Sequence, residues 1–176
     1  MKFALSRRKR IVLEVMSKPS IPTEIRRKMN LNRNNNLSTT LKQLCKLKLM
    51  RCINPRSRTG RIYRLTHKGL KIRKQLFVNA KFTPYVEPKL NWSIYGWIVS
   101  GRQKKAILKG MKQHLPLRYI RENAQNFNPK ISRMNANDVL RLFVNKGIAN
   151  KVKQNNRIFY SLTKIGEALR NQLLEP

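Results

Sequence analysis

The sequence predicts a mainly α-helical fold with small β-hairpins, an α+β class, present twice along the chain. A seven-residue motif occurs twice, as YRLTHKG at residues 63–69 and as YSLTKIG at residues 160–166. A similar amphipathic run follows each copy and ends in Gln-Leu, at residues 75–76 and 172–173. The repeat distance is close to half of the 176 residues, so the sequence predicts two small domains rather than one.

Each copy of the motif is preceded by a pattern typical of a β-hairpin. In the first copy, a strand that ends at Ile53 is followed by the turn NPRSRTG and a second strand at residues 61–65. In the second copy, Lys151 and Val152 lead through KQNN to a strand at residues 157–160. β-prone residues on both sides of a short polar turn predict two antiparallel strands.

Thr66 and Thr163 stand at the N-cap of the helix after each hairpin, where a hydroxyl accepts a hydrogen bond from a first-turn amide. The pattern Y-x-L-T-x-x-G after a hairpin resembles the winged helix-turn-helix regulators of the MarR, ArsR and PadR type. The resemblance covers residues 8–76 and 103–173. It implies two tandem winged helix-turn-helix domains, mainly α with small β-hairpin wings, that bind double-stranded DNA through their third helices and wings.

The sequence divides into a first domain at residues 1–78, an aromatic-rich connector at 79–101 and a second domain at 102–176. Residues 77–101 hold six of the 13 aromatic side chains and show no clear period. A flexible linker would instead be polar and rich in glycine or serine. We therefore expect the connector to pack, either fixing the two domains or forming a dimer contact. Stacking on single-stranded bases is the alternative.

The charge of the chain indicates a polyanionic partner. Forty Lys and Arg side chains against seven Asp and Glu give a formal net charge of +33, and both halves of the chain are basic. A thermophile-type surface of ion-pair networks would need abundant glutamate, which is scarce here. Such an excess of positive charge is typical of proteins that bind nucleic acids.

The reactive side chains are too few and too scattered for an enzyme or a metal centre. Cys45 and Cys52 are the only cysteines, and with His67 and His114 they form no C-x-x-C or H-x-x-x-H spacing. Without paired carboxylates or a glycine-rich phosphate loop, we expect no catalytic activity, cofactor or metal. The sequence shows no signal peptide and no membrane-spanning run, which predicts a cytoplasmic, nucleoid-associated protein without membrane contact.

The apolar pattern of the first domain predicts four helices. They lie at about residues 8–17, 23–29 and 35–47, and from Thr66 to near Leu76. The third helix carries its apolar stripe as Leu37, Leu41 and Leu44, which we expect to form the core. The fourth helix is expected to bury Leu70, together with Ile72 and Leu76.

The face of the third helix opposite its leucines is polar and carries no acidic residue. At about 3.6 residues per turn, this face presents Asn35, Ser38, Thr39, Lys42, Gln43 and Lys46. Amide, hydroxyl and ammonium groups can hydrogen-bond to base edges in a DNA major groove. The first wing adds Arg56, Arg58 and Arg61 in a flexible loop, which suits a narrow minor groove or, alternatively, contact to phosphate alone.

The second domain repeats the buried pattern of the first. Its residues Ile107, Leu108, Met111 and Ile120 correspond to Val12, Leu13, Met16 and Ile25. Further along, Ala136, Leu140, Phe143 and Ile148 correspond to Leu37, Leu41, Leu44 and Leu49. The matching core positions predict that both domains fold in the same way.

The outward face of the third helix differs between the two domains. In the second domain it carries Met134, Asp138, Leu142 and Asn145 beside the candidate DNA contacts Arg133, Asn137 and Arg141. Asp138 can accept a hydrogen bond from cytosine but repels phosphate, and exposed apolar side chains suit a protein contact. We therefore expect less base reading here, and a homodimer or protein contact through this domain or the connector. The wing candidates for backbone contact are Lys151, Lys153, Asn155, Asn156 and Arg157.

Two classes of function remain open at this point. The leading hypothesis is a transcriptional regulator that binds double-stranded DNA without a cofactor. The alternative is a sequence-independent packaging protein, or a protein associated with RNA or the ribosome, because the net charge exceeds what sequence-specific repression requires.

Overall fold

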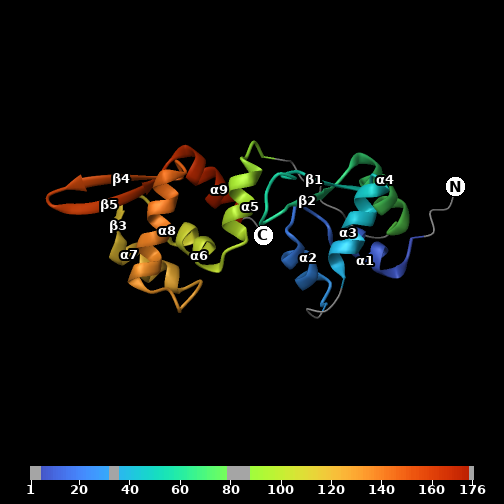
Figure 1. The fold of residues 1–176 in the computed structure, drawn as a ribbon, viewed down its shortest axis with the longest axis horizontal. Helices are drawn as coiled ribbons and strands as arrows, with labels where there is room; N and C mark the ends of the chain where they lie inside the picture. The colour runs from blue at the N-terminus through green and yellow to red at the C-terminus, as the bar shows by residue number, and fades with distance from the viewer. Residues whose placement is uncertain (1–4, 32–35, 79–87, 175–176) are drawn as a thin grey trace. The chain divides into compact units, whose positions relative to one another are not determined.

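The structure is a computed structural model that describes residues 5–31, 36–78 and 88–174. Over these residues the fold is mixed α+β, with nine helices and two small antiparallel sheets (Figure 1). The chain forms two compact units. Unit 1 comprises Met1–Glu87 and Trp92–Gly96, and unit 2 comprises Pro88–Asn91 and Trp97–Pro176.

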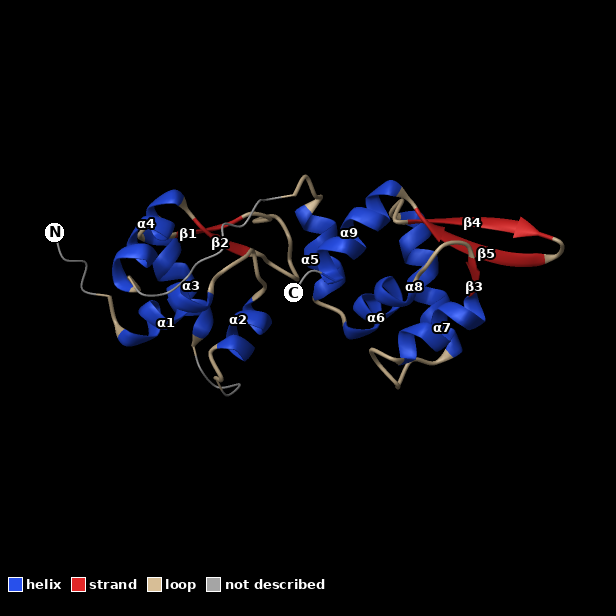
Figure 2. Ribbon diagram, turned by 180° about the vertical axis from the view of Figure 1, so that it is seen from behind, coloured by secondary structure: helices blue, strands red, loops and turns tan. Residues whose placement is uncertain are grey.

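Unit 1 combines a helical cluster with a two-stranded hairpin (Figure 2). Its elements are α1 (Arg7–Val15), α2 (Pro22–Lys28), α3 (Leu37–Lys46), β1 (Met50–Cys52), β2 (Tyr63–Leu65) and α4 (His67–Leu76). The strands pair antiparallel, with Met50 opposite Leu65. Ser20, between α1 and α2, adds a single bridge to Tyr63. A core of side chains from α1, α2, α3 and the hairpin therefore holds the unit together.

Unit 2 has the same order of elements with a larger sheet. They are α6 (Arg102–Gly110), β3 (Leu115–Pro116), α7 (Leu117–Gln125), α8 (Arg133–Asn145), β4 (Ala149–Gln154), β5 (Arg157–Leu162) and α9 (Lys164–Leu174). The strand order is β3-β5-β4, and Leu115 stands opposite Tyr160. This pairing repeats the bridge between Ser20 and Tyr63 in unit 1. The β4–β5 hairpin projects beyond α8 (Figure 1).

The aromatic stretch that shows no period in the sequence contains a helix, α5 (Trp92–Val99). Its sequence, WSIYGWIV, is apolar on nearly every side, and such a helix lacks the alternation of polar and apolar residues that reveals an amphipathic one. Ile98 and Val99 are buried. Helix α5 contributes its first five residues to unit 1 and its last three to unit 2.

The corresponding apolar positions of the two copies are buried alike. Val12, Leu13, Met16 and Ile25 in unit 1, and Ile107, Leu108, Met111 and Ile120 in unit 2, are at most 2% exposed. The second set of corresponding positions is buried as well. Its members, Leu37, Leu41, Leu44 and Leu49 in unit 1 and Ala136, Leu140, Phe143 and Ile148 in unit 2, are at most 1% exposed. The predicted repeat of core positions is thus confirmed.

The burial predicted for α4 is wrong at Leu70, which is 44% exposed. Gly69, Ile72 and Arg73 are the buried residues of this helix, and Leu76 is half-buried. These four residues follow the spacing of one helix face, and Leu70 lies outside it. The Gly69 backbone lies directly against the Leu49 carbonyl, and this contact places Gly69 rather than Leu70 on the inner face of the helix.

A threonine corner fixes the start of the last helix in each copy. The Thr66 hydroxyl donates to the Lys48 carbonyl at 2.6 Å and accepts from the Gly69 amide at 3.1 Å. In unit 2 the Thr163 hydroxyl donates to the Gly147 carbonyl at 2.7 Å and accepts from the Gly166 amide at 3.1 Å. The corner therefore joins the end of the third helix to the start of the last one.

The glycine of the motif is required by a close approach of two backbones. A Cβ at Gly69 would lie 2.0 Å from the Leu49 carbonyl oxygen, and one at Gly166 would lie 2.1 Å from the Ile148 carbonyl oxygen. No side chain can be accommodated at either position unless the backbone moves. In the pattern L-T-x-x-G, the threonine thus supplies the capping hydroxyl, and the glycine lets the first turn of the helix pack directly against a main-chain carbonyl.

We expect Gly166→Ala to lower the free energy of unfolding by about 1–3 kcal/mol, because the added methyl group must displace a main-chain carbonyl. Urea unfolding of the full chain, followed by circular dichroism, measures this loss. Gly147→Asn is the matched control, because Gly147 has φ of +65° and no heavy atom within 4 Å of an added Cβ. Asparagine tolerates that conformation. Equal losses for both variants would contradict the packing explanation.

Candidate nucleic-acid interface

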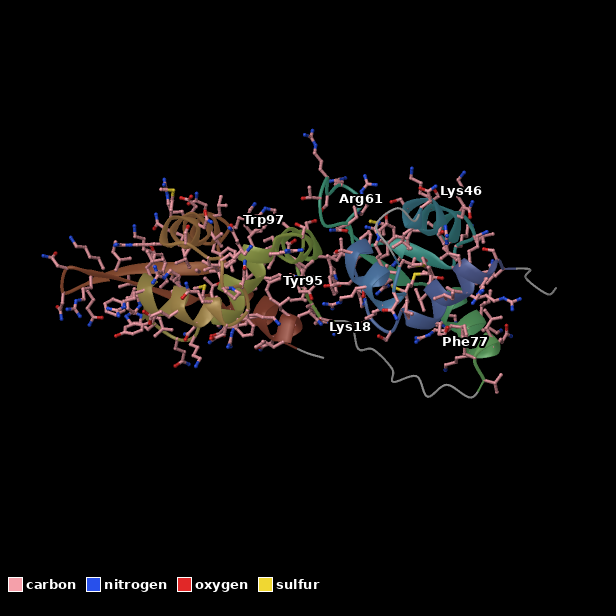
Figure 3. All side chains as sticks on the ribbon, turned by 90° about the horizontal axis from the view of Figure 1, so that it is seen from below. Lys18, Lys46, Arg61, Phe77, Tyr95 and Trp97 are labelled. Carbon is pink, nitrogen blue, oxygen red and sulfur yellow. The ribbon has the colours of Figure 1, made fainter. Side chains whose placement is uncertain are left out.

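Helix α3 separates a buried leucine face from an exposed polar one. Leu37, Leu41 and Leu44 are at most 1% exposed, and they anchor the helix in the core of unit 1. The predicted outward residues Ser38, Thr39, Lys42, Gln43 and Lys46 are all exposed. Lys46 is labelled on α3 in Figure 3. The remaining predicted residue of this face, Asn35, lies outside the described residues.

The exposed face of α3 has the chemistry of a groove-reading surface. The helix LSTTLKQLCK contains no acidic residue, so nothing on it repels phosphate. Its hydroxyl and amide groups can donate or accept hydrogen bonds at base edges, and its ammonium groups can donate to guanine or to phosphate. Because the leucines fix the helix from behind, these groups are presented from a rigid element.

The loop between β1 and β2 is ordered by the buried side chain of Asn54, which is 4% exposed. Its carbonyl oxygen accepts from the Ile62 amide at 2.7 Å. Its amide nitrogen donates to the carbonyls of Gly60 at 3.0 Å and Trp92 at 3.4 Å. The loop that the sequence predicts to be flexible is therefore tied across its base and to the first residue of α5.

The three predicted arginines of this loop are exposed. Arg56, Arg58 and Arg61 all project from the segment that Asn54 closes, and Arg61 is labelled in Figure 3. The Arg61 Nε group donates to the Ser57 carbonyl at 3.2 Å, which fixes the course of its side chain. The loop thus places three cations close together in the hairpin, on a backbone that the Asn54 side chain holds through hydrogen bonds.

In unit 2 the corresponding helix, α8, presents a mixed surface. Ser132 caps the helix by accepting from the Asn135 amide at 3.1 Å. Arg133 and Arg141 are exposed and Asn137 is half-buried. The exposed face also carries Asp138, and Met134 and Leu142 are 74% and 44% exposed. Carboxylate and apolar groups make this face less suitable than α3 for a groove.

The second hairpin is longer than the first because its turn is shorter. Asn155 and Asn156 have φ of 47° and 57°, which is the geometry of a two-residue hairpin turn that matches the twist of the strands. Pairing therefore continues out to Gln154 opposite Arg157. The predicted wing residues Lys151, Lys153, Asn155, Asn156 and Arg157 are all exposed. Three of the five are cations along one projecting ribbon.

An arginine-lined pocket, not expected from the sequence, lies between α7 and α8. It has a volume of about 260 Å³ and is lined by Leu117, Arg118, Arg121 and Arg133. Arg118 is held by Glu122, with Nε 2.9 Å from the carboxylate oxygen. The Nε group of Arg121 is buried without a hydrogen-bond partner in the described part of the chain. The pocket is therefore suited to an anionic group with oxygen acceptors.

Sequence reasoning identified Arg133 but not Arg118 or Arg121. One signal in the sequence could have singled out Arg121. It directly follows the core residue Ile120, just as Arg26 follows the corresponding core residue Ile25. The Nε groups of Arg26 and Arg121 are both buried without a partner in the described residues. Because 40 residues are basic, charge alone does not single out these two arginines.

The two cysteines are free thiols and half-buried. Burial, and secondarily the neighbouring Cys52, raise the pKa of Cys45, so its thiol stays protonated at neutral pH. Within the described residues, no three His, Cys, Asp or Glu side chains come together as a metal site. The same residues include no helix with the length and apolarity needed to span a bilayer.

We expect Asn54→Ala to speed hydrogen exchange of the Ile62 amide about 5- to 150-fold, because removing the buried acceptor costs roughly 1–3 kcal/mol. Nuclear magnetic resonance of the full chain measures the rate at this amide. The exposed Asn171 of α9 provides the matched control, Asn171→Ala, which should leave the rate unchanged. An unchanged rate in Asn54→Ala would show that other contacts hold the loop.

No family model, curated protein or solved structure matches this chain.

Proposed function

We propose that the chain is a double-stranded DNA-binding protein with two tandem winged helix-turn-helix domains, acting as a transcriptional regulator. The order of elements supports this proposal, because each unit has three helices, a hairpin and a final helix. In both units, a residue just before the second helix also pairs with the second strand of the hairpin: Ser20 pairs with Tyr63, and Leu115 pairs with Tyr160. In this arrangement the third helix is the reading element and the hairpin is the wing.

The observation that carries the proposal is the outer face of α3. It has five exposed polar or cationic side chains and no acid, while the opposite face is fixed in the core. An α-helix with its side chains is about 10–12 Å in diameter, which fits the width of a DNA major groove. Within this face, Gln43 suits adenine, and Lys42 and Lys46 suit guanine or phosphate.

The wings add contacts that hold the backbone. Arg56, Arg58 and Arg61 are arranged on a tied loop, where they can reach a narrow minor groove or flanking phosphates. In unit 2, the hairpin cations and the arginine pocket supply phosphate contacts. Phosphate contacts then provide most of the affinity, and α3 provides most of the sequence preference. A protein of this kind is expected to be found with the chromosome in the nucleoid.

Sequence-independent packaging, or binding to RNA, is the second candidate function. The observation that favours it is the combination of a net charge of +33 with a third helix in unit 2 that carries Asp138 in its exposed face. Met134 and Leu142 on the same face favour a protein contact, either with a second copy or with another protein. The carboxylate and the apolar side chains make the exposed face of α8 poorly suited to base edges. They leave α3 of unit 1 as the single helix suited to reading bases.

We expect selection from a random duplex DNA pool, at about 0.15 M salt with an RNA competitor, to enrich a short motif. Sequencing of the bound fraction reveals it. Lys42→Ala should abolish or shift the enrichment, because a bidentate base contact contributes about 1–3 kcal/mol of discrimination. Lys71→Ala removes the same charge from an exposed position on α4 and should preserve the motif.

Three results are decisive for the choice between the candidate functions. Enrichment that Lys42→Ala removes and Lys71→Ala keeps supports a regulator that reads DNA through α3. Tight binding without any motif supports packaging and overturns sequence reading. Preference for the RNA competitor supports the RNA-binding candidate and overturns double-stranded DNA as the partner.

Arg58→Ala should reduce the slope of log affinity against log salt concentration by about 0.9, because one phosphate contact releases about that number of counterions. Fluorescence anisotropy of a labelled duplex, measured at four or more salt concentrations, gives the slope. The loss should be the same for a selected and an unrelated sequence if the contact is to phosphate. A loss confined to the selected sequence would instead assign Arg58 to base reading in the minor groove.

A further inference from the structure

Two lysines of unit 2 share one tryptophan ring. The Lys104 ammonium lies 4.0 Å from the centroid of Trp97, and the Lys146 ammonium lies 5.0 Å from the same centroid. Trp97 itself packs with its ring at 65° to that of Phe143, 6.1 Å between centroids. Trp97 is labelled near the end of α5 in Figure 3. The cluster thus brings together α5, α6 and the end of α8.

A single lysine over a tryptophan is a common stabilising contact, but two lysines on one ring repel each other. Neither lysine forms an ion pair in the described part of the chain. Burial first, and Lys146 second, lower the pKa of Lys104. No described carboxylate contributes to that shift. Among the residues that the structure describes, the pair is therefore a concentration of positive charge without a counterion.

The backbone favours this position of Lys104. A Cβ at Gly101 would lie 2.3 Å from the Lys104 Cε atom. The aliphatic part of the Lys104 side chain therefore packs against Gly101, in the space that a larger residue would fill. Lys104 also lies in the first turn of α6, where a cation opposes the helix dipole. The side chain is thus directed across the start of its own helix at an electrostatic cost.

The repeated fold does not require this cluster. By the correspondence of core positions, unit 1 has Lys9 where unit 2 has Lys104, and Leu47 where unit 2 has Lys146. Leu47 packs against the core of unit 1. The same architecture is therefore stable without the second cation, and the pair is a feature of unit 2 alone.

We propose that Lys104 and Lys146 form a clamp for one phosphate group, held at the edge of the Trp97 ring. The proposal rests on the function proposed above and assigns the phosphate to the nucleic-acid backbone. Two ammonium groups offer six N–H donors, and a phosphodiester offers oxygen acceptors with one negative charge. A bound phosphate removes the repulsion between the lysines.

The test uses the full chain with Trp92→Phe, which leaves Trp97 as the single tryptophan. Duplex DNA of about 20 base pairs is titrated in, and in parallel inorganic phosphate is titrated against sodium chloride of equal ionic strength. We expect DNA to change the Trp97 emission, because the ammonium groups move from the ring to the phosphate. Inorganic phosphate at millimolar concentration should have no more effect than the chloride.

Substitutions then separate the clamp from general charge. Lys104→Gln and Lys146→Gln should each weaken DNA binding about 3- to 10-fold, as expected for loss of a charge-assisted hydrogen bond. Each should also reduce or abolish the emission change. Lys164→Gln removes one charge from an exposed position at the start of α9 and should do neither. Lys146→Arg keeps the charge and the donors and should retain binding, and circular dichroism checks that each variant is folded.

The possible outcomes are distinct. If DNA binds without changing the emission, and both clamp variants match Lys164→Gln, the clamp is refuted while the proposed function stands. If DNA fails to bind at all, the proposed function and the clamp are refuted together. A response to inorganic phosphate equal to that to DNA would overturn the assignment to a nucleic-acid backbone and indicate a free-phosphate site.

Discussion

The threonine corner is the interaction on which the arrangement of each unit depends. One hydroxyl donates to the carbonyl of the second residue after the third helix and accepts from an amide of the last helix. The backbone N–H of the same threonine donates to the carbonyl one residue further along, that of Leu49 in unit 1 and of Ile148 in unit 2, at 3.0 Å in both. The segment that follows the third helix and the first turn of the last helix therefore meet at a single threonine. The end of the third helix, the base of the hairpin and the start of the last helix are held in one geometry because all three meet at this corner.

The two copies share this frame and diverge on its surface. In unit 1 the third helix is free of acids and the hairpin is short, with a loop closed by Asn54. In unit 2 the third helix carries Asp138, the hairpin is long, and additional cations lie in the pocket around Arg121 and beside Trp97. The same architecture thus supports a surface suited to base edges in one unit and one suited to phosphates in the other.

Much of the fold follows from patterns in the sequence, and the failures have physical causes. The core positions were predictable because leucine spacing on α3 and the matching positions on α8 are determined by helix geometry. The expectation that Leu70 is buried is wrong, because α4 packs on the Leu49 carbonyl through Gly69, and hydropathy gives no sign of a backbone contact through a glycine. Helix α5 has no amphipathic period. The pocket arginines and the lysine pair were missed because they depend on contacts between separate elements.

The strand order of unit 2 leaves the outer edge of β4 without a partner strand in the described residues. Its unpaired amides and carbonyls are a template on which another extended chain can assemble. Lys151 and Lys153 are exposed along this strand, and their like charges repel the same strand of a neighbouring molecule. The charges of these two lysines therefore oppose edge-to-edge assembly of the projecting hairpin with its copies, an effect that grows in importance with protein concentration.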